Sequence, residues 1–324
     1  MEQMPQISSR PAPETLRLGH WPDHENQPAA PETMRLGRWP DQPLQSQEPP
    51  EQSRLETLRT IEHTEDIATQ LSIEMSRAYP YRQEQILTRL KQDADLRKKI
   101  LESNEIGGIA KNKPLLIRLE NGQDAVYKPQ NREQAELARG IPVGSYAARE
   151  WLVAQIDQAL QLDLVPPTVL RDGPEGMGSV QAWQDNCEVG MGVDYWESPR
   201  VEQIKLALLD AITGNVDRHA GNFLVEKQTG RYVAIDNGLV FSSNAADQTW
   251  SAALREVGGQ NLSDQDMQVI GSRINAFFHA PGVQQVLRRA FDLALGYEAE
   301  SAWEKFVSSL RNIEHNHQLP KSEK

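Results

Sequence analysis

The chain has 324 residues and a net charge of −12, with 46 acidic and 34 basic side chains. This acidic balance argues against nucleic-acid binding, which usually relies on a basic stripe. No apolar run is long enough to span a bilayer, and the first residues lack the apolar core of a secretory signal. The single Cys187 excludes an internal disulfide framework and is typical of a reducing, cytoplasmic compartment.

Residues 1–52 are rich in Pro, Gln and Glu and show no helical or strand period, which predicts a disordered tail. The tail contains a repeat, because "APETLRLGHWPD" at 12–23 returns as "APETMRLGRWPD" at 30–41. Two copies are too few for a solenoid but can make a short binding motif bivalent. Thr15 and Thr33 are therefore candidate phospho-acceptor or docking positions; the alternative is a duplicated spacer without function.

Residues 53–103 predict a helical extension. Apolar residues recur there at three-to-four spacing in two runs, separated by "YPY" at 79–81, and the second helix is expected to continue through residue 103. Both helices are expected to be amphipathic and to pack on the neighbouring domain.

Residues 104–186 predict a β-rich lobe. "KPLLIRLENGQDAVYKP" contains two strand-like runs joined by Asn121-Gly122, a strong hairpin signal. A helix is expected at about 145–160, followed by strands in "LVPPTVL" and "GSVQAWQ".

Residues 187–318 predict a mostly helical lobe, followed by a short tail at 319–324. Its first helix is expected to have Ser198 as N-cap and Pro199 at the first helical position. A hairpin with its turn at Thr229-Gly230 follows. Three further helices are expected at 263–279, 282–296 and 298–313.

The stretch "GNVDRHAGNFLVEKQTGRYVAIDNG" at 214–238 holds the polar residues that favour phosphoryl-transfer chemistry. Asp217 and Asn222 have the spacing of a kinase catalytic loop, in which the Asp acts as base and the Asn binds magnesium. Asp236 follows the strand-like "YVAI", and the intervening hairpin should bring it back beside Asn222. Oxygen ligands of this kind suit magnesium, although each residue alone is a common loop residue.

The nucleotide phosphates need a cation, and Lys128 at the end of "DAVYK" is placed to supply it, about ninety residues before Asp217. Such a lysine needs an acidic partner, for which Glu150 on the following helix is the best candidate. Backbone groups around Gln181 to Trp183 could meet the adenine edge. Gly107-Gly108 is the nearest candidate for a phosphate-covering loop.

"GNVDRHAGNFLV" and "AIDNG" resemble the catalytic and metal-binding loops of the phosphatidylinositol 3-/4-kinase-related superfamily, which includes the HipA-type bacterial Ser/Thr kinases. "AVYKP" and "LVPPTVLRDGPEGMGSVQ" resemble the bacterial phosphatidylinositol-kinase-like proteins. The resemblance covers roughly 104–245. It implies an α+β, two-lobed protein-kinase-like fold that uses ATP and Mg²⁺, with Asp217 as base, Asn222 and Asp236 as metal ligands, and Lys128 as phosphate contact.

The sequence departs from this resemblance at two points. Asn237 stands where the family commonly has a phenylalanine or tyrosine beside the metal-binding Asp, and no full glycine-rich loop precedes Lys128. Compared with the kinase catalytic loop, the order is Asp-Arg-His rather than His-Arg-Asp.

The leading hypothesis is an ATP- and magnesium-dependent Ser/Thr protein kinase that could phosphorylate its own tail and so recruit a phosphopeptide-binding partner. The alternatives are a lipid or small-molecule kinase or a nucleotidyl transferase on the same fold, and a catalytically weak kinase-fold scaffold. The acceptor is not identified by any motif.

Overall fold

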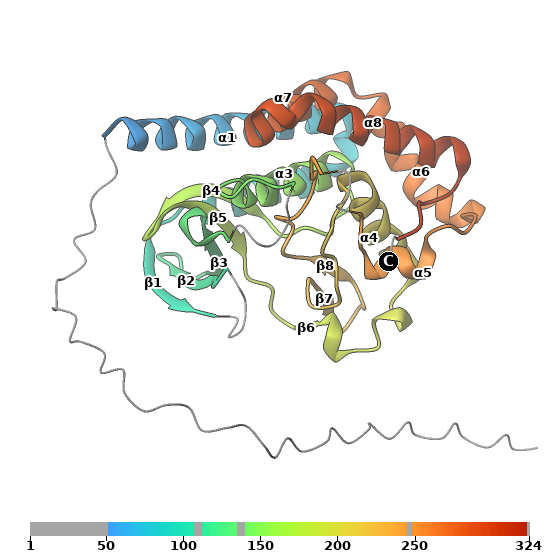
Figure 1. Ribbon diagram of the computed structural model, residues 1–324, viewed down its shortest axis with the longest axis horizontal. Coiled ribbons are helices and arrows are strands. Elements are labelled where there is room, and N and C mark those ends of the chain that lie inside the picture. Colours follow the sequence, from blue (N-terminus) through green and yellow to red (C-terminus); the bar gives the residue numbers. More distant parts are fainter. Residues whose placement is uncertain (1–50, 107–111, 135–139, 245–247, 323–324) are drawn as a thin grey trace, which may run out of the picture. The chain divides into compact units, whose positions relative to one another are not determined.

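The computed structural model describes residues 51–106, 112–134, 140–244 and 248–322. Residues 1–50 of the predicted disordered tail, with Thr15 and Thr33, lie outside these residues, and so does the Gly107-Gly108 pair. The last two residues of the predicted tail, 51 and 52, are not disordered but begin the helix α1 (Glu51–Ala78). Within the described residues, one larger β-sheet is followed in the chain by a mostly helical region (Figure 1). This order agrees with the expected α+β class, with a sheet lobe followed by a helical lobe.

The larger sheet has five antiparallel strands among the described residues, in the order β1-β2-β3-β5-β4. Gly122 has φ +80 in the predicted Asn121-Gly122 turn, a backbone conformation that glycine adopts without strain. Side chains alternate along β3, so Ala125 and Tyr127 enter the small core of the sheet while Lys128 points to the other face. The strands are β1 (Ile100–Glu105), β2 (Leu115–Leu119), β3 (Asp124–Pro129), β4 (Thr168–Gly173) and β5 (Gly176–Ala182).

The helices build a second and larger core, into which almost every residue of α3 is buried. α1 packs along α7 and also touches α3, so the helical extension lies on the neighbouring domain as the sequence predicts (Figure 1). The helices are α1 (Glu51–Ala78), α2 (Gln83–Asp95), α3 (Tyr146–Ala159), α4 (Arg200–Thr213), α5 (Ala252–Val257), α6 (Asp264–Phe278), α7 (Pro281–Leu295) and α8 (Ala299–Asn316).

α3 is fixed to the helical core by Arg149, whose side chain is fully buried. Its guanidinium donates to the carbonyl oxygens of Val240 and Phe241 at 2.7 and 3.0 Å, and it pairs with Glu298 just before α8. The helix that was expected to belong to the β-rich lobe is therefore anchored mainly to the helical one.

The prediction that the second helix of the extension reaches residue 103 is wrong. α2 ends at Asp95, and residues 100–105 form β1 at the edge of the sheet. Lysine, leucine and glutamate favour a helix locally, but pairing with β2 overrides this preference. Arg171 donates to the carbonyl oxygens of Leu96 and Lys98, which holds the chain in its turn between the two elements.

The predicted start of the next helix is also wrong, by one position. α4 begins at Arg200 with Pro199 as its N-cap and without a side-chain cap. The N–H of Ser198 instead closes the preceding short helical turn on Tyr195 O, at 3.0 Å, so Ser198 belongs to that turn.

A second sheet of three strands, in the order β6-β7-β8, lies in the helical lobe. The predicted hairpin is present, with Gly230 at φ +70 in its turn. The sequence reading missed β6, which pairs with β7. The strands are β6 (Cys187–Val189), β7 (Phe223–Glu226) and β8 (Tyr232–Ala234).

The residues at 319–322 are packed rather than loose, since Leu319 is fully buried and accepts a backbone hydrogen bond from Gly259 at 2.9 Å. Across the described ranges, no helix combines the length and the apolar character that a bilayer crossing requires.

Asp157 of α3 is buried and holds the turn that follows the helix. Its Oδ1 accepts from the Leu164 N–H at 2.9 Å. Burial raises the pKa of this carboxyl from 3.8 to about 7, despite the backbone hydrogen bond that opposes the shift. The folded protein therefore keeps this proton over a pH range in which the unfolded chain has lost it.

We predict that Asp157 makes the wild-type protein less stable as the pH rises through 7. Because the folded state binds more protons than the unfolded state between pH 4 and 7, the free energy of unfolding should fall by about 1 kcal/mol between pH 6 and pH 8. Asp157→Asn keeps an acceptor for Leu164 and should lack this component. Urea unfolding of both proteins at the two pH values measures the difference, and parallel pH profiles would contradict the prediction.

Candidate active site

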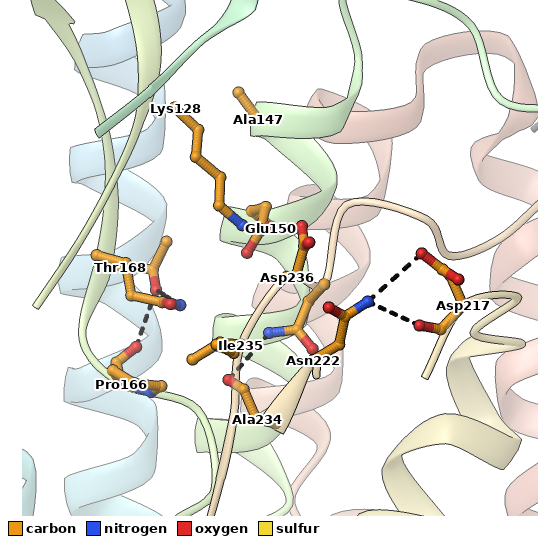
Figure 2. Close-up of polar contacts among 12 residues, drawn as sticks. Lys128, Ala147, Glu150, Pro166, Thr168, Asp217, Asn222, Ala234, Ile235 and Asp236 are labelled. Carbon is orange, nitrogen blue, oxygen red and sulfur yellow. Dashed lines mark hydrogen bonds and ion pairs between the residues drawn. The ribbon is translucent and has the colours of Figure 1, made fainter. Parts of the chain in front are cut away.

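Lys128 lies between two carboxylates at the junction of the two lobes (Figure 2). Its Nζ pairs with Glu150 of α3 and lies 3.0 Å from Asp236 Oδ1, which follows β8. The pairing of Lys128 with Glu150 agrees with the sequence prediction. Glu150 is buried, whereas half of the Asp236 side chain is exposed.

The charges in this group determine how its members titrate. Burial opposes the charged form of Lys128, but the attraction of Asp236 and Glu150 outweighs it and raises the lysine pKa. Lys128 in turn holds the pKa of Asp236 below its usual value. The lysine is thus a fixed cation at neutral pH, and Asp236 is a carboxylate with an exposed side.

Asp217 and Asn222 belong to the loop between α4 and β7. The Asn222 Nδ2 donates to the Asp217 backbone oxygen at 2.8 Å and to its Oδ2 at 3.4 Å. The Ile235 N–H donates to Asn222 O at 3.2 Å, so the hairpin brings Asn222 and Asp236 to the same place, as its spacing suggests. Figure 2 shows Asn222 between Asp217 and Asp236, with its amide nitrogen towards Asp217.

The Asp217 carboxyl is partly buried, and this burial raises its pKa. The negative charge of Asp236 adds to the shift, while His219 opposes it. A carboxylate with a raised pKa is a better proton acceptor than one in bulk water.

The two loops are joined by Arg218, the residue after Asp217, whose side chain is fully buried. Its guanidinium donates to the carbonyl oxygens of Asn222 and Ile235 and to the side-chain oxygen of Asn237. Its Nε donates to Asp210 of α4 at 3.0 Å. One side chain therefore binds the segment of Asn222, the segment of Asp236 and the underlying helix.

Asn237 is the least typical residue of the sequence motif, and this network accounts for it. Its Oδ1 accepts from Arg218, and its Nδ2 donates to Ala234 O at 3.2 Å. Asp210 also accepts from Ser251 Oγ at 2.7 Å, and the same Ser251 oxygen caps α5. Asn237 thus fixes the backbone beside Asp236, where the chain takes the left-handed φ of +55.

The two residues predicted near the adenine edge are engaged in the sheet. Gln181 is buried and its Nε2 donates to Thr168 Oγ1 at 2.9 Å, while the Trp183 N–H donates to Asp124 O at 3.2 Å. The Trp183 side chain is 43% exposed at the end of β5. An adenine contact of the backbone groups at this position stays a prediction.

The available donors fit a magnesium ion that is shared with a bound nucleotide. Asn222 uses its amide nitrogen for Asp217, which leaves the carbonyl oxygen of the side chain for a ligand, and Asp236 is half exposed. In the described ranges, no three or more His, Cys, Asp or Glu side chains gather as a cage. Magnesium typically takes one or two protein oxygens together with substrate phosphates rather than a cage of protein ligands.

Sequence reasoning missed Arg218, Asp210 and Ser251. Asp210 lies within an apolar helical run, "LALLDAIT", and a charge in such a run is a usable signal, because a buried carboxylate needs a partner. Arg218 sits between two residues already chosen for chemistry, where a structural role is easily overlooked.

Comparison with known proteins finds a matching family model and two relatives in sequence. Residues 202–254, which contain Asp210 to Ser251, match the family model of phosphatidylinositol 3- and 4-kinase. Protein Rv2133c of Mycobacterium tuberculosis is 23% identical over 47% of this chain and 65% of its own length. Phosphatidylinositol 4-kinase gamma 4 of Oryza sativa subsp. japonica is 29% identical over 49% of this chain and 33% of its own length. The chain thus spans less than two thirds of either relative.

Solved structures that resemble the chain include two kinases. The Helicobacter pylori proinflammatory kinase CtkA aligns at 14% identity and a TM-score of 0.40, over 68% of this chain and 93% of that one. A Golgi casein kinase with Mn and ADP bound aligns at 14% identity and a TM-score of 0.44, over 72% of this chain and 76% of that one.

We predict that removal of the Arg218 charge destabilises the fold more than removal of an exposed one. Arg218→Met leaves Asp210 buried without its ion partner and should lower the free energy of unfolding by about 3–5 kcal/mol. Adding Asp210→Asn should restore part of this loss, because no uncompensated charge then remains. Denaturant unfolding measures all three proteins.

Arg200→Met is the matched control, since Arg200 pairs with Asp266 but is half exposed. That variant should lose less than about 1 kcal/mol. If Arg200→Met and Arg218→Met lowered the free energy of unfolding equally, the buried network would contribute no more to stability than an exposed ion pair.

Proposed function

We propose that this relative of the phosphatidylinositol 3- and 4-kinases is an ATP- and magnesium-dependent phosphotransferase that acts on Ser or Thr hydroxyl groups of proteins. The observation that carries the proposal is the convergence of one cation and three oxygen-bearing side chains from separate segments. Lys128 comes from β3, Asp217 and Asn222 from the loop after α4, and Asp236 from the end of β8.

On the nucleotide side, Lys128 is the group to hold the phosphates, and Glu150 is the group to hold Lys128. The Glu150 pair is buried, whereas the contact with Asp236 is half exposed, so phosphate oxygens can replace the second contact while the first remains. A bound magnesium ion would neutralise charge on the phosphates, and Asn222 and Asp236 are the side chains to hold it.

On the acceptor side, Asp217 is placed to orient the hydroxyl and accept its proton. The hydroxyl oxygen forms the new bond to the γ-phosphorus, the bond from that phosphorus to the bridging oxygen breaks, and ADP leaves. The hydrogen bond from Asn222 keeps the Asp217 carboxylate directed towards the metal site. The raised pKa of Asp217 supports its assignment as base.

A protein acceptor is favoured over a lipid by charge. The net charge of −12 opposes binding to an anionic membrane, which typically attracts basic surfaces. Thr15 and Thr33 of the duplicated motif are the candidate acceptors within the chain itself. Their phosphorylation would create sites for a phosphopeptide-binding partner.

We predict that Asp217→Asn lowers turnover by about two to four orders of magnitude and leaves the fold intact, because the base is lost while the loop hydrogen bonds remain possible. ATP labelled on the γ-phosphate should transfer its label to protein, and ATP labelled on the α-phosphate should not. Transfer of the α-label instead would establish a nucleotidyl transferase.

Asp172→Asn is the matched control, as Asp172 is an exposed carboxylate on β4. It should retain wild-type turnover. Activity of the Asp217 variant equal to that of this control would refute Asp217 as the base.

We further predict that incubation with ATP and magnesium adds phosphate to Thr15 and Thr33, because each lies in a copy of the same motif within reach of an active site on its own or a second molecule. Intact-mass and peptide mass spectrometry should show up to two phosphates, both lost in a Thr15→Ala/Thr33→Ala variant. An unmodified tail on an enzyme that phosphorylates other proteins would remove the tail as a substrate.

A further inference from the structure

Three apolar side chains are exposed beside the candidate catalytic loop, and we refer to them as the Met191 surface. Met191 is 73% exposed, Trp196 55% and Val189 43%. They come from consecutive short elements, namely the end of β6 and the helical turns η3 (Gly190–Gly192) and η4 (Tyr195–Glu197). Isolated exposed apolar residues are ordinary, but three in one segment of eight residues suggest a binding surface.

The Met191 surface is attached directly to the loop that carries Asp217 and Asn222. The Met191 N–H donates to Ala220 O at 2.9 Å. Gly190 approaches so closely that an added Cβ would lie 2.6 Å from the Phe223 ring and 2.7 Å from Ala220 O. A substrate whose hydroxyl reaches Asp217 therefore has this surface next to it.

Aromatic contacts continue this attachment. The Trp196 ring meets the Tyr195 ring edge-on at 5.2 Å, and Tyr195 meets Phe223 at 5.3 Å. Phe223 directly follows Asn222 in the sequence. A chain of two ring contacts therefore connects Trp196 to Phe223, the neighbour of the proposed metal ligand Asn222.

The segment that bears the surface is acidic. Residues 183–199 contain four acidic residues, Asp185, Glu188, Asp194 and Glu197, and no lysine or arginine. Glu188 pairs with Lys227 at 2.9 Å, so the other three supply the acidic character. A ligand that packs on the apolar side chains would therefore gain from basic residues of its own. This composition is unsuited to a phosphoinositide headgroup, which carries several negative charges.

We propose that the Met191 surface binds the duplicated motif of this chain, and so presents Thr15 or Thr33 to Asp217. This inference rests on the proposed kinase function and specifies its acceptor. Each motif has the required chemistry next to its threonine. "TLRLGHW" and "TMRLGRW" both combine large apolar residues with arginine.

The connecting chain is long enough for the motif to bind within one molecule. Glu51, the first residue of α1, lies eighteen positions after Thr33. Extended, this stretch reaches up to about 60 Å, whereas a compact domain of this size has a diameter of about 50 Å.

The first experiment measures binding of a fluorescent peptide of residues 12–23 to the full chain carrying Asp217→Asn, so that no turnover interferes. In both experiments the full chain also carries Arg17→Glu and Arg35→Glu, so that its own motifs do not occupy the surface. Trp196→Glu and Met191→Glu should each weaken binding at least tenfold, because a carboxylate replaces an apolar contact within an acidic segment. The peptide variant Arg17→Glu should also bind at least tenfold more weakly. Tyr297→Glu, at a residue 88% exposed on another element, should have no effect.

The second experiment measures phosphorylation of the same peptide by the full chain with an otherwise wild-type active site. Trp196→Glu should raise the KM for the peptide at least tenfold and leave the KM for ATP unchanged. Circular dichroism and thermal unfolding confirm that the variants are folded.

The two experiments separate this inference from the proposed function. Peptide binding that depends on Trp196, without transfer of the γ-phosphate to this peptide or to any other protein, would refute the kinase proposal and leave the docking surface in place. Phosphorylation and binding that are insensitive to Trp196 and Met191, or absence of peptide binding, would overturn the docking surface. The docking surface would also be overturned if Trp196→Glu left peptide binding unchanged and instead abolished self-association or binding to phosphatidylserine vesicles. The surface would then bind a second copy of the chain or a membrane.

Discussion

The active-site geometry depends above all on the buried guanidinium of Arg218. It holds two carbonyl oxygens and one amide oxygen from the segments that carry Asn222 and Asp236, and it is itself held by Asp210. A buried cation is costly unless its donors are satisfied, and here the partners come from α4 and from both loops. The requirement to satisfy one charge therefore brings together residues that are distant in the chain.

The same principle operates at Arg149, one residue before Glu150. The carbonyl oxygens of Val240 and Phe241, which it binds, lie just downstream of Asp236. The segment that follows the proposed metal ligand Asp236 therefore also positions Glu150, through its contacts with Arg149. Two fully buried arginines, each adjacent in sequence to a residue with a proposed chemical role, position the segments of Glu150 and of Asp236 relative to each other.

The sequence predicts well those features that depend on local chemistry. The Asn121-Gly122 and Thr229-Gly230 turns follow from residues that adopt a positive φ, and the closeness of Asn222 and Asp236 follows from the hairpin between them. It fails where tertiary contacts decide. Residues 100–103 end a run with helical periodicity, but residues 100–105 are paired by β2. β6 is too short to be recognised without its partner β7. Arg218 could not be assigned, because its partners are known only once α4 and both loops are folded together.

The separation of the two hydrophobic cores has a consequence for how nucleotide affinity could vary. Lys128 belongs to the sheet, which has its own small core, whereas α3 and Glu150 belong to the helical core. The Lys128–Glu150 pair therefore spans a mechanical boundary, while Asp217, Asn222 and Asp236 all lie on one side of it. A bending of the sheet relative to the helices would lengthen the pairs of Lys128 with Glu150 and with Asp236, and would leave the proposed proton acceptor and metal ligands in register with one another. Such bending would alter how tightly ATP is held rather than the rate of the chemical step.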